Sequence, residues 1–188
     1  MADNALLFEL MCQKARSLCD TDLNASIISV SDITFDPKFR DMCAANMCGK
    51  YGRCWTCPPF AGEVDQLISR AKLFEYALVY QMIFPLEDSF DYEGMVDAKA
   101  KFTEFSVRFR KLFDGEYNLP ALHLSAGGCG ICEKCAKISD EPCRFPSLAI
   151  SSLEAYCIDV SRLAKSAGMK YINGVNTVTY FGAVLFNT

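Results

Sequence analysis

The chain has 188 residues, of which 51% are hydrophobic and 22% are charged, and its formal net charge is -4 at pH 7. This length favours a single domain that spans residues 1–188. The balance of hydrophobic and charged residues differs from the low-hydrophobicity, high-charge composition of a disordered chain and excludes that class. The acidic charge also argues against a general affinity for a phosphate backbone, so no nucleic-acid partner is expected.

The N-terminal stretch MADNALLFELMCQKARS has no basic leader followed by an apolar block, and no apolar run reaches the length of a bilayer span. We therefore expect a cytoplasmic protein without membrane association. Eleven cysteines without a secretory signal favour a reducing compartment, where thiols stay available for metals or chemistry. A disulfide framework is the weaker interpretation, because the cysteine count is odd and many cysteines lie two residues apart.

Hydrophobic periodicity predicts four helices. Apolar residues at three- and four-residue steps predict helices over 3–19, 64–71 and 91–113, the last capped by Gly115. Ser151 and Glu154 have the spacing of a capping box, and Gly168 suits a helix end. These signals predict one helix over 151–168.

Four β-branched or apolar runs predict strands over 25–33, 75–84, 119–125 and 176–186, of which the last belongs inside the sheet. Because helices and strands alternate, we expect an α/β fold: a single layered domain with a mixed sheet flanked by helices and two cysteine-rich metal-binding loops. The strand end at Ser125 and the turn at Cys57 are expected at one edge of this sheet.

The stretch GGCGICEKCAKISDEPCRFP, residues 127–146, contains four of the cysteines. Cys129, Cys132 and Cys135 form C-x2-C-x2-C, and Cys143 follows after seven intervening residues. This resembles the bacterial ferredoxin run that binds a [4Fe-4S] cluster, with a longer gap before the last thiol. Structural zinc is the alternative, although zinc is usually bound by two separated CxxC pairs, and a triplet leaves one thiol redundant.

The stretch CAANMCGKYGRCWTCPPFAG, residues 43–62, supplies a second set of four thiols: Cys43, Cys48, Cys54 and Cys57. Their spacing is less diagnostic. It allows half of a zinc ribbon, a second cubane, or a site shared with the other loop. In two-cluster ferredoxins the cysteine before proline binds the other cluster, so Cys57 or Cys143 could cross over in the same way.

Together the motifs CxxxxCxxYGxxWxCPPFAG, CGxCxxCxxxxxxPCRFP, SLEAYCIDV and VTYFGAVLF resemble an uncharacterised bacterial and archaeal family described as predicted metal-binding, a cysteine-rich domain of unknown function. The resemblance runs from about Cys43 to the C-terminus. It implies metal ligation by the following cysteines: Cys43, Cys48, Cys57, Cys129, Cys132, Cys135 and Cys143. Cys54 occupies a position not firmly associated with cysteine in that family.

The remaining cysteines, Cys12, Cys19 and Cys157, lie on predicted helices and are interpreted as small buried hydrophobes. His123 is the only histidine, and its solitude excludes a Cys2His2 finger and a three-histidine zinc centre. We interpret it as a structural side chain, with a ligand or proton-relay role as the minor alternative.

The eight clustered thiols, without recognisable substrate machinery, predict an iron-sulfur protein with two [4Fe-4S] clusters that passes electrons to a redox partner protein. One alternative is an enzyme or cofactor-maturation factor with a substrate-accessible cluster, because an incomplete thiolate set leaves a coordination position free. The other is a structural zinc module that mediates interactions. The sequence does not decide the oligomeric state.

Overall fold

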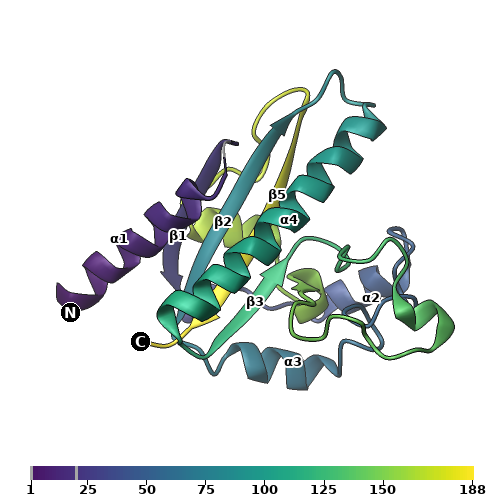
Figure 1. The fold of residues 1–188 in the computed structure, drawn as a ribbon, viewed down its shortest axis with the longest axis horizontal. Helices are drawn as coiled ribbons and strands as arrows, with labels where there is room; N and C mark the ends of the chain where they lie inside the picture. The colour runs from purple at the N-terminus through teal and green to yellow at the C-terminus, as the bar shows by residue number, and fades with distance from the viewer. Residues whose placement is uncertain (1, 20) are drawn as a thin grey trace.

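The computed structural model describes residues 2–19 and 21–188. Its strands form one five-stranded sheet in the order β1-β2-β5-β3-β4 (Figure 1). The strands are β1 (Leu23–Ser29), β2 (Tyr76–Pro85), β3 (Ala121–Ser125), β4 (Ser151–Ser152) and β5 (Thr177–Phe186). The pairs β1–β2, β2–β5 and β5–β3 are antiparallel, whereas β3 and the short β4 are parallel. The expected mixed sheet is therefore confirmed.

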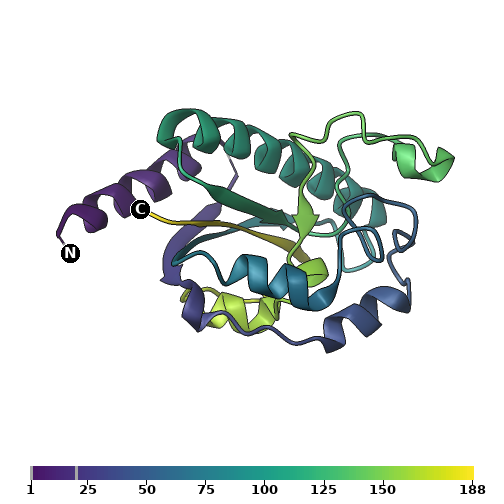
Figure 2. The same cartoon turned by 90° about the horizontal axis from the view of Figure 1, so that it is seen from below.

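Helices cover both faces of the sheet, as Figure 2 shows edge-on. On one face, α1 (Ala2–Ser17) and α4 (Tyr92–Tyr117) pack with Met11, Phe102 and Phe109 against the strands. On the other face, α3 (Val64–Ala71) and α5 (Val160–Ser166) pack with Leu67 and Leu163. The layering confirms the predicted α/β class. No helix in the described parts of the chain is both long and apolar enough to span a bilayer.

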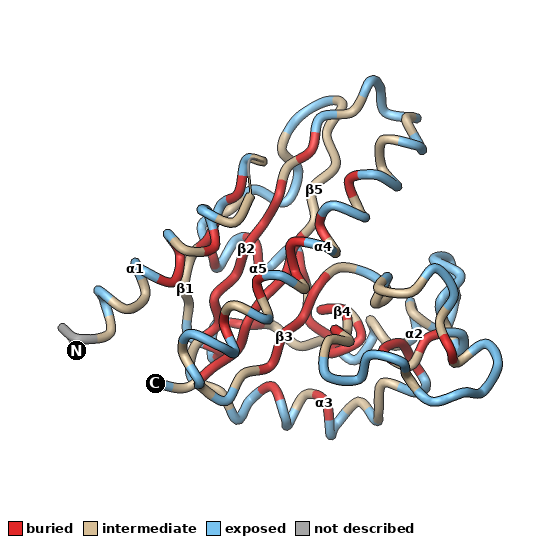
Figure 3. Tube along the Cα trace, in the orientation of Figure 1, coloured by how far each residue is buried: buried red, intermediate tan, exposed pale blue. Residues whose placement is uncertain are grey.

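The long strands β2 and β5 lie inside the sheet, where both of their faces are covered (Figure 3). Residues Ala77 to Met82 of β2 are all buried, and so are residues Phe181 to Phe186 of β5. Continuous burial explains why these segments are apolar at successive positions instead of alternating with polar residues. The expected internal position of the last strand is confirmed.

The single helix predicted over 151–168 is wrong. A 3-10 turn, η3 (Glu154–Tyr156), is followed by Cys157 at φ 59°, and α5 then begins after its cap Asp159. The Asp159 N–H donates to the Thr34 carbonyl at 3.0 Å, and Phe35 forms a β-bridge with Ile158. Pairing with this distant segment draws the chain out of the helix, which local sequence cannot reveal.

Other elements also differ from the prediction. The strand predicted over 25–33 ends at Ser29 of β1, where the 3-10 turn η1 (Val30–Asp32) follows. Helix α4 runs through Gly115 to Tyr117, and Asn118 ends it in the left-handed conformation at φ 48°. Asparagine is one of the few residues other than glycine that adopts this conformation readily. The periodicity did not predict a further helix, α2 (Lys38–Ala44), which carries Cys43, the first cysteine of the 43–62 stretch. This helix has no buried residue, so it lacks the apolar stripe on which such predictions depend.

Candidate metal centre

The two cysteine loops meet beyond the end of β3, at the end of the molecule opposite the chain termini (Figure 1). The first loop joins α2 to α3, and the second joins β3 to β4. A Cβ atom placed on Gly128 would lie 3.6 Å from Cys57 Sγ and 3.2 Å from Lys50 Cγ. The segment that leaves β3 at Ser125 thus packs against the Cys57 turn, as the sequence predicted.

Side chains of the two loops also join them farther from the sheet. Trp55 Nε1 donates a hydrogen bond to the Glu141 carbonyl at 2.9 Å. The Lys137 ammonium lies 4.7 Å from the Trp55 ring centroid and 4.0 Å from that of Phe60, and it also contacts the Asp140 carboxylate. A cation held between two aromatic faces and a carboxylate fixes the first loop against the second.

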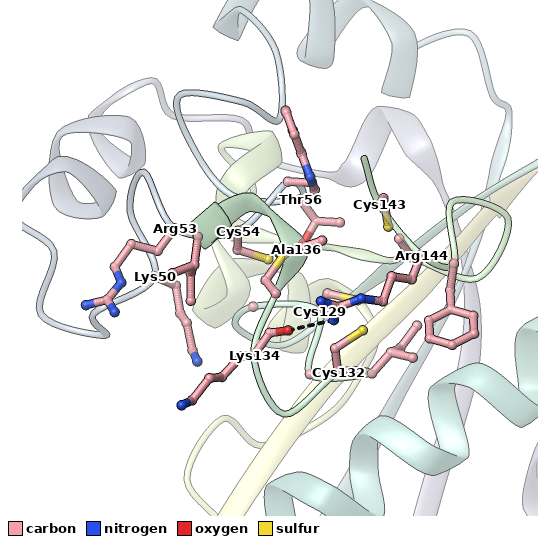
Figure 4. Close-up of a pocket in the computed structure, with 18 of the residues that line it drawn as sticks. Lys50, Arg53, Cys54, Thr56, Cys129, Cys132, Lys134, Ala136, Cys143 and Arg144 are labelled. Carbon is pink, nitrogen blue, oxygen red and sulfur yellow. Dashed lines mark hydrogen bonds between the residues drawn. The ribbon is translucent and has the colours of Figure 1, made fainter. Parts of the chain in front are cut away.

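Thiols from both loops line a first cavity of about 310 Å³. The cysteines on its wall are Cys54, Cys129, Cys132, Cys135 and Cys143. Figure 4 shows the labelled members of this set around one space, with the Arg144 side chain among them. Arg144 Nη1 donates to the Lys134 carbonyl at 3.1 Å and so bridges the second loop.

A second cavity, of about 540 Å³, lies on the other side of the Gly127–Gly128 segment. Three cysteines line it: Cys43, Cys48 and Cys57. Gly128 belongs to the walls of both cavities, so a single stretch of backbone separates them. The eight cysteines predicted as ligands are therefore distributed five to one cavity and three to the other.

Within residues 2–19 and 21–188, no three Cys, His, Asp or Glu side chains are grouped closely enough to hold a single metal ion. The eight thiols instead lie around cavities. Their donor chemistry fits an iron-sulfur cluster, because such clusters are held by cysteine thiolates. The residues that would hold such clusters come from the eight cysteines named above.

The Cys54 and Cys57 thiols contact each other, although they line different cavities. Hydrogen bonds from the Cys57 thiol and from Thr56 Oγ1, at 3.3 Å, outweigh burial and lower the pKa of Cys54 to about 4. The Cys129 backbone N–H also donates to Cys54. The same thiol contact, together with burial, raises the pKa of Cys57.

Basic side chains outnumber acidic ones on the wall of the first cavity, which also includes Glu133, although the whole chain is acidic. Four exposed basic side chains line it: Lys50, Arg53, Lys134 and Arg144. Inside the protein, Lys99 Nζ donates to Thr103 Oγ1 at 2.6 Å, and burial lowers its pKa although the nearby Cys129 and Glu154 act in the opposite sense. Cations in these positions would offset the negative charge of thiolate-bound clusters.

The structure keeps the other candidate residues out of both cavities. His123 Nε2 lies 2.8 Å from Asp114 Oδ1 beside helix α4, which supports its structural interpretation. Cys12 and Cys157 are buried, and Cys19 Sγ donates to the Thr21 carbonyl at 3.5 Å.

Sequence reasoning missed Glu154 as a residue of the second cavity wall, because its spacing from Ser151 was interpreted as a capping box. In the structure the Ser152 hydroxyl, and not that of Ser151, accepts a hydrogen bond there, from the Ala155 N–H at 3.0 Å. Burial raises the pKa of the Glu154 carboxyl. Nothing else in the sequence around Glu154, which precedes the buried Tyr156 and Cys157, indicated a ligand site.

The family model described as "Predicted metal-binding protein (DUF2284)" matches residues 26–186. Neither the curated proteins nor the solved structures include a match to this chain.

Proposed function

The chain belongs to this family of predicted metal-binding proteins, and from that membership we propose that it holds two [4Fe-4S] clusters and passes single electrons to a partner enzyme. The observation that supports this most directly is the arrangement of eight thiols around two adjoining cavities. A cluster of this kind stores and releases one electron at a potential that depends on its charge, its hydrogen bonds and its exposure to water.

In the first cavity, Cys129, Cys132 and Cys135 supply the closely spaced thiolates and Cys143 supplies the remote one, in the ferredoxin-like order. Gly130 adopts φ +71°, and this left-handed turn lets the backbone curl between two of the ligands. The aromatic rings of Trp55 and Phe60, 5.5 Å apart, cover the loop beside this cavity. Such cover limits access of water to a cluster and thereby adjusts its potential.

The same cavity offers a place for the partner to dock. Its four basic side chains form the surface that we call the basic rim: Lys50, Arg53, Lys134 and Arg144. On a chain of net charge -4, this local concentration of positive charge favours an acidic partner protein. We therefore infer that the redox partner is an acidic one-electron carrier or an acidic face of an enzyme.

Metal and sulfide analysis of protein purified without oxygen tests the proposal. The expected result is about eight iron and eight acid-labile sulfide per chain, with a broad visible absorption that dithionite bleaches. Cys132→Ser should remove the iron of one cluster, whereas Cys12→Ala, which lies outside both loops, should retain all of it. Two zinc ions and neither iron nor sulfide would instead identify a structural zinc module.

A further inference from the structure

We propose that the second cavity binds its cluster through three thiolates, those of Cys43, Cys48 and Cys57, and that the Glu154 carboxylate completes the site as a displaceable ligand. A small organic anion would then bind at this cavity in place of the carboxylate. The inference rests on the proposed function and deepens it, because it separates an electron-transfer cluster from a ligand-binding one.

The position of Cys54 leaves the second cavity with three thiols. Cys54 lines the first cavity only, where it accepts a hydrogen bond from the Cys129 N–H. Cys57, three residues later, lines the second cavity only. Four cysteines other than Cys54 already line the first cavity, so both clusters can form without the Cys54 thiolate.

Glu154 lies on the wall of the second cavity beside one of these thiols. Its side chain lines this cavity together with those of Cys43, Cys48 and Cys57. The other carboxylate of the cavity, Asp159, is already engaged, because its Oδ1 accepts from Ser161 Oγ at 2.8 Å and from the Arg162 N–H at 3.1 Å. Glu154 takes part in no ion pair within 4.0 Å in the described chain. Its carboxylate accepts hydrogen bonds from the Ser152 side chain and from its own backbone N–H. Unlike Asp159, which also pairs with Arg162 Nε at 3.5 Å, it keeps acceptor positions on its oxygens for a metal without breaking an ion pair.

The second cavity has room and an apolar entrance for a ligand. It is larger than the first, at about 540 Å³ against about 310 Å³. Its lining includes Phe39, Met42, Met47 and Tyr171, of which Met47 is 92% exposed and Met42 is 64% exposed. Flexible methionines at a mouth adapt to apolar groups of different shape. A ligand with an anionic end for iron and an apolar body matches this lining.

Removal of one iron provides the first test. A cluster iron without a cysteine ligand is released more readily, so limited ferricyanide oxidation of the wild-type protein should convert one cluster only to a three-iron form, detected by electron paramagnetic resonance. Glu154→Ala and Glu154→Gln should accelerate this conversion about tenfold, as expected for loss of a group that supports a metal. Glu104→Gln, an exposed carboxylate on α4, is the matched control and should keep the wild-type rate.

The glutamine variant preserves side-chain size, so a folding defect of the alanine variant does not decide the result. Equal conversion rates in the wild type and in Glu154→Gln would overturn the role of Glu154. Protein that holds eight irons but forms no three-iron cluster would overturn the inference while the proposed function stands. Protein without iron would overturn both.

Binding of ¹³C-labelled cyanide, used as the probe anion, provides the second test. The reduced wild-type protein should show ¹³C hyperfine coupling from one cluster, and Glu154→Ala should bind cyanide about tenfold more tightly, because no carboxylate competes. Absence of coupling in both proteins would contradict a displaceable ligand.

Serine substitutions test the division of the thiols. Cys54→Ser should retain both clusters and the three-iron conversion, whereas Cys57→Ser should lose the iron of the second cluster. Loss of the convertible cluster from Cys54→Ser would show that Cys54 belongs to the second site and would overturn the inference.

Discussion

Trp55 is the residue through which the first cysteine loop holds the second. Its indole N–H donates to the Glu141 carbonyl, and its ring faces the Lys137 ammonium. Trp55→Phe keeps an aromatic face and removes the donor, so we expect the free energy of unfolding to fall by about 1 kcal/mol. Urea unfolding followed by circular dichroism measures this.

The matched control for that substitution is Tyr92→Phe, because Tyr92 is exposed at the start of α4. Its free energy of unfolding should stay at the wild-type value. An unchanged Trp55→Phe protein would mean that the hydrogen bond to Glu141 contributes nothing to the contact between the loops.

His123 gives the protein a pH-dependent stability. Burial lowers its pKa from the ordinary value of 6.5, although Asp114 acts in the opposite direction and Arg110 adds to the lowering. As the pH falls below about 6.5, the unfolded chain takes up this proton before the folded one does, so the free energy of unfolding decreases. Above that pH the contribution is fully present.

Because the chain has one histidine, its imidazole C–H signal in proton nuclear magnetic resonance reports this titration directly. We expect a midpoint below 6.5, and His123→Gln should flatten the dependence of stability on pH between 5 and 7. A midpoint above 6.5 would show that the Asp114 contact dominates over burial.

At the scale of elements, substitution of two glycines by alanine should have opposite effects on stability, because one glycine is crowded by a neighbouring side chain and the other is surrounded by open space. Gly182 in β5 pairs with Tyr80 in β2, and a Cβ atom there would overlap the Tyr80 ring. Phenylalanines of α4 enclose that ring, and the Tyr80 hydroxyl donates to Ser106 Oγ at 3.2 Å, so the ring cannot move aside easily. We expect Gly182→Ala to lower the free energy of unfolding by about 1–3 kcal/mol.

Gly115 lies in the last turns of α4 with open space around its Cα. Gly115→Ala should therefore raise the free energy of unfolding by about 0.5–1 kcal/mol, since alanine loses less backbone entropy in a helix. Thermal unfolding of the two variants under identical metal loading measures both effects. A destabilised Gly115→Ala protein would contradict the continuous helix and favour the cap that the sequence first indicated.

The sequence predicts those elements whose cause is local. The phenylalanine spacing of α4 and the apolar run of β2 follow from packing on a helical face or inside a sheet. The break at Cys157 and the start of α5 depend on contacts with Thr34 and Phe35, more than a hundred residues away, so no local pattern contains them.

The same division applies to the candidate site. Spacing identifies the eight cysteines as a set, because regularly spaced thiols in glycine-rich loops are typical of cluster ligands. It does not assign Cys54 and Cys57 to different cavities, since their directions depend on how the first loop packs against Gly128. Glu154 begins the η3 turn and lines the second cavity, and Cys157 at φ 59° ends this turn inside the segment predicted as one helix.

At the scale of the whole molecule, the proposed redox partner should associate at the basic rim. The rate at which the reduced protein reduces an acidic flavodoxin should fall as the salt concentration rises, because screening weakens attraction between opposite charges. Combined Arg53→Glu and Lys134→Glu should lower the second-order rate constant about tenfold at low salt. Stopped-flow absorbance measures this rate.

The control for these charge reversals is Lys111→Glu, an exposed lysine on α4 outside the rim, which should leave the rate near the wild-type value. A rate that is independent of salt in the wild type would show that the partner docks elsewhere.

The Gly127–Gly128 segment has a final consequence for internal electron flow. Gly128 forms part of both cavity walls, and the Cys54 and Cys57 thiols, which line different cavities, contact each other, so only a thin partition separates the two sets of thiols. With a cluster in each cavity, an electron accepted at the basic rim would tunnel across that thin partition to the other cluster. This transfer would be faster than the binding and release of partner proteins, so partner binding would limit the overall rate of electron transfer. A bulkier residue at 128 would meet Lys50 and Cys57, and the partition would widen with it.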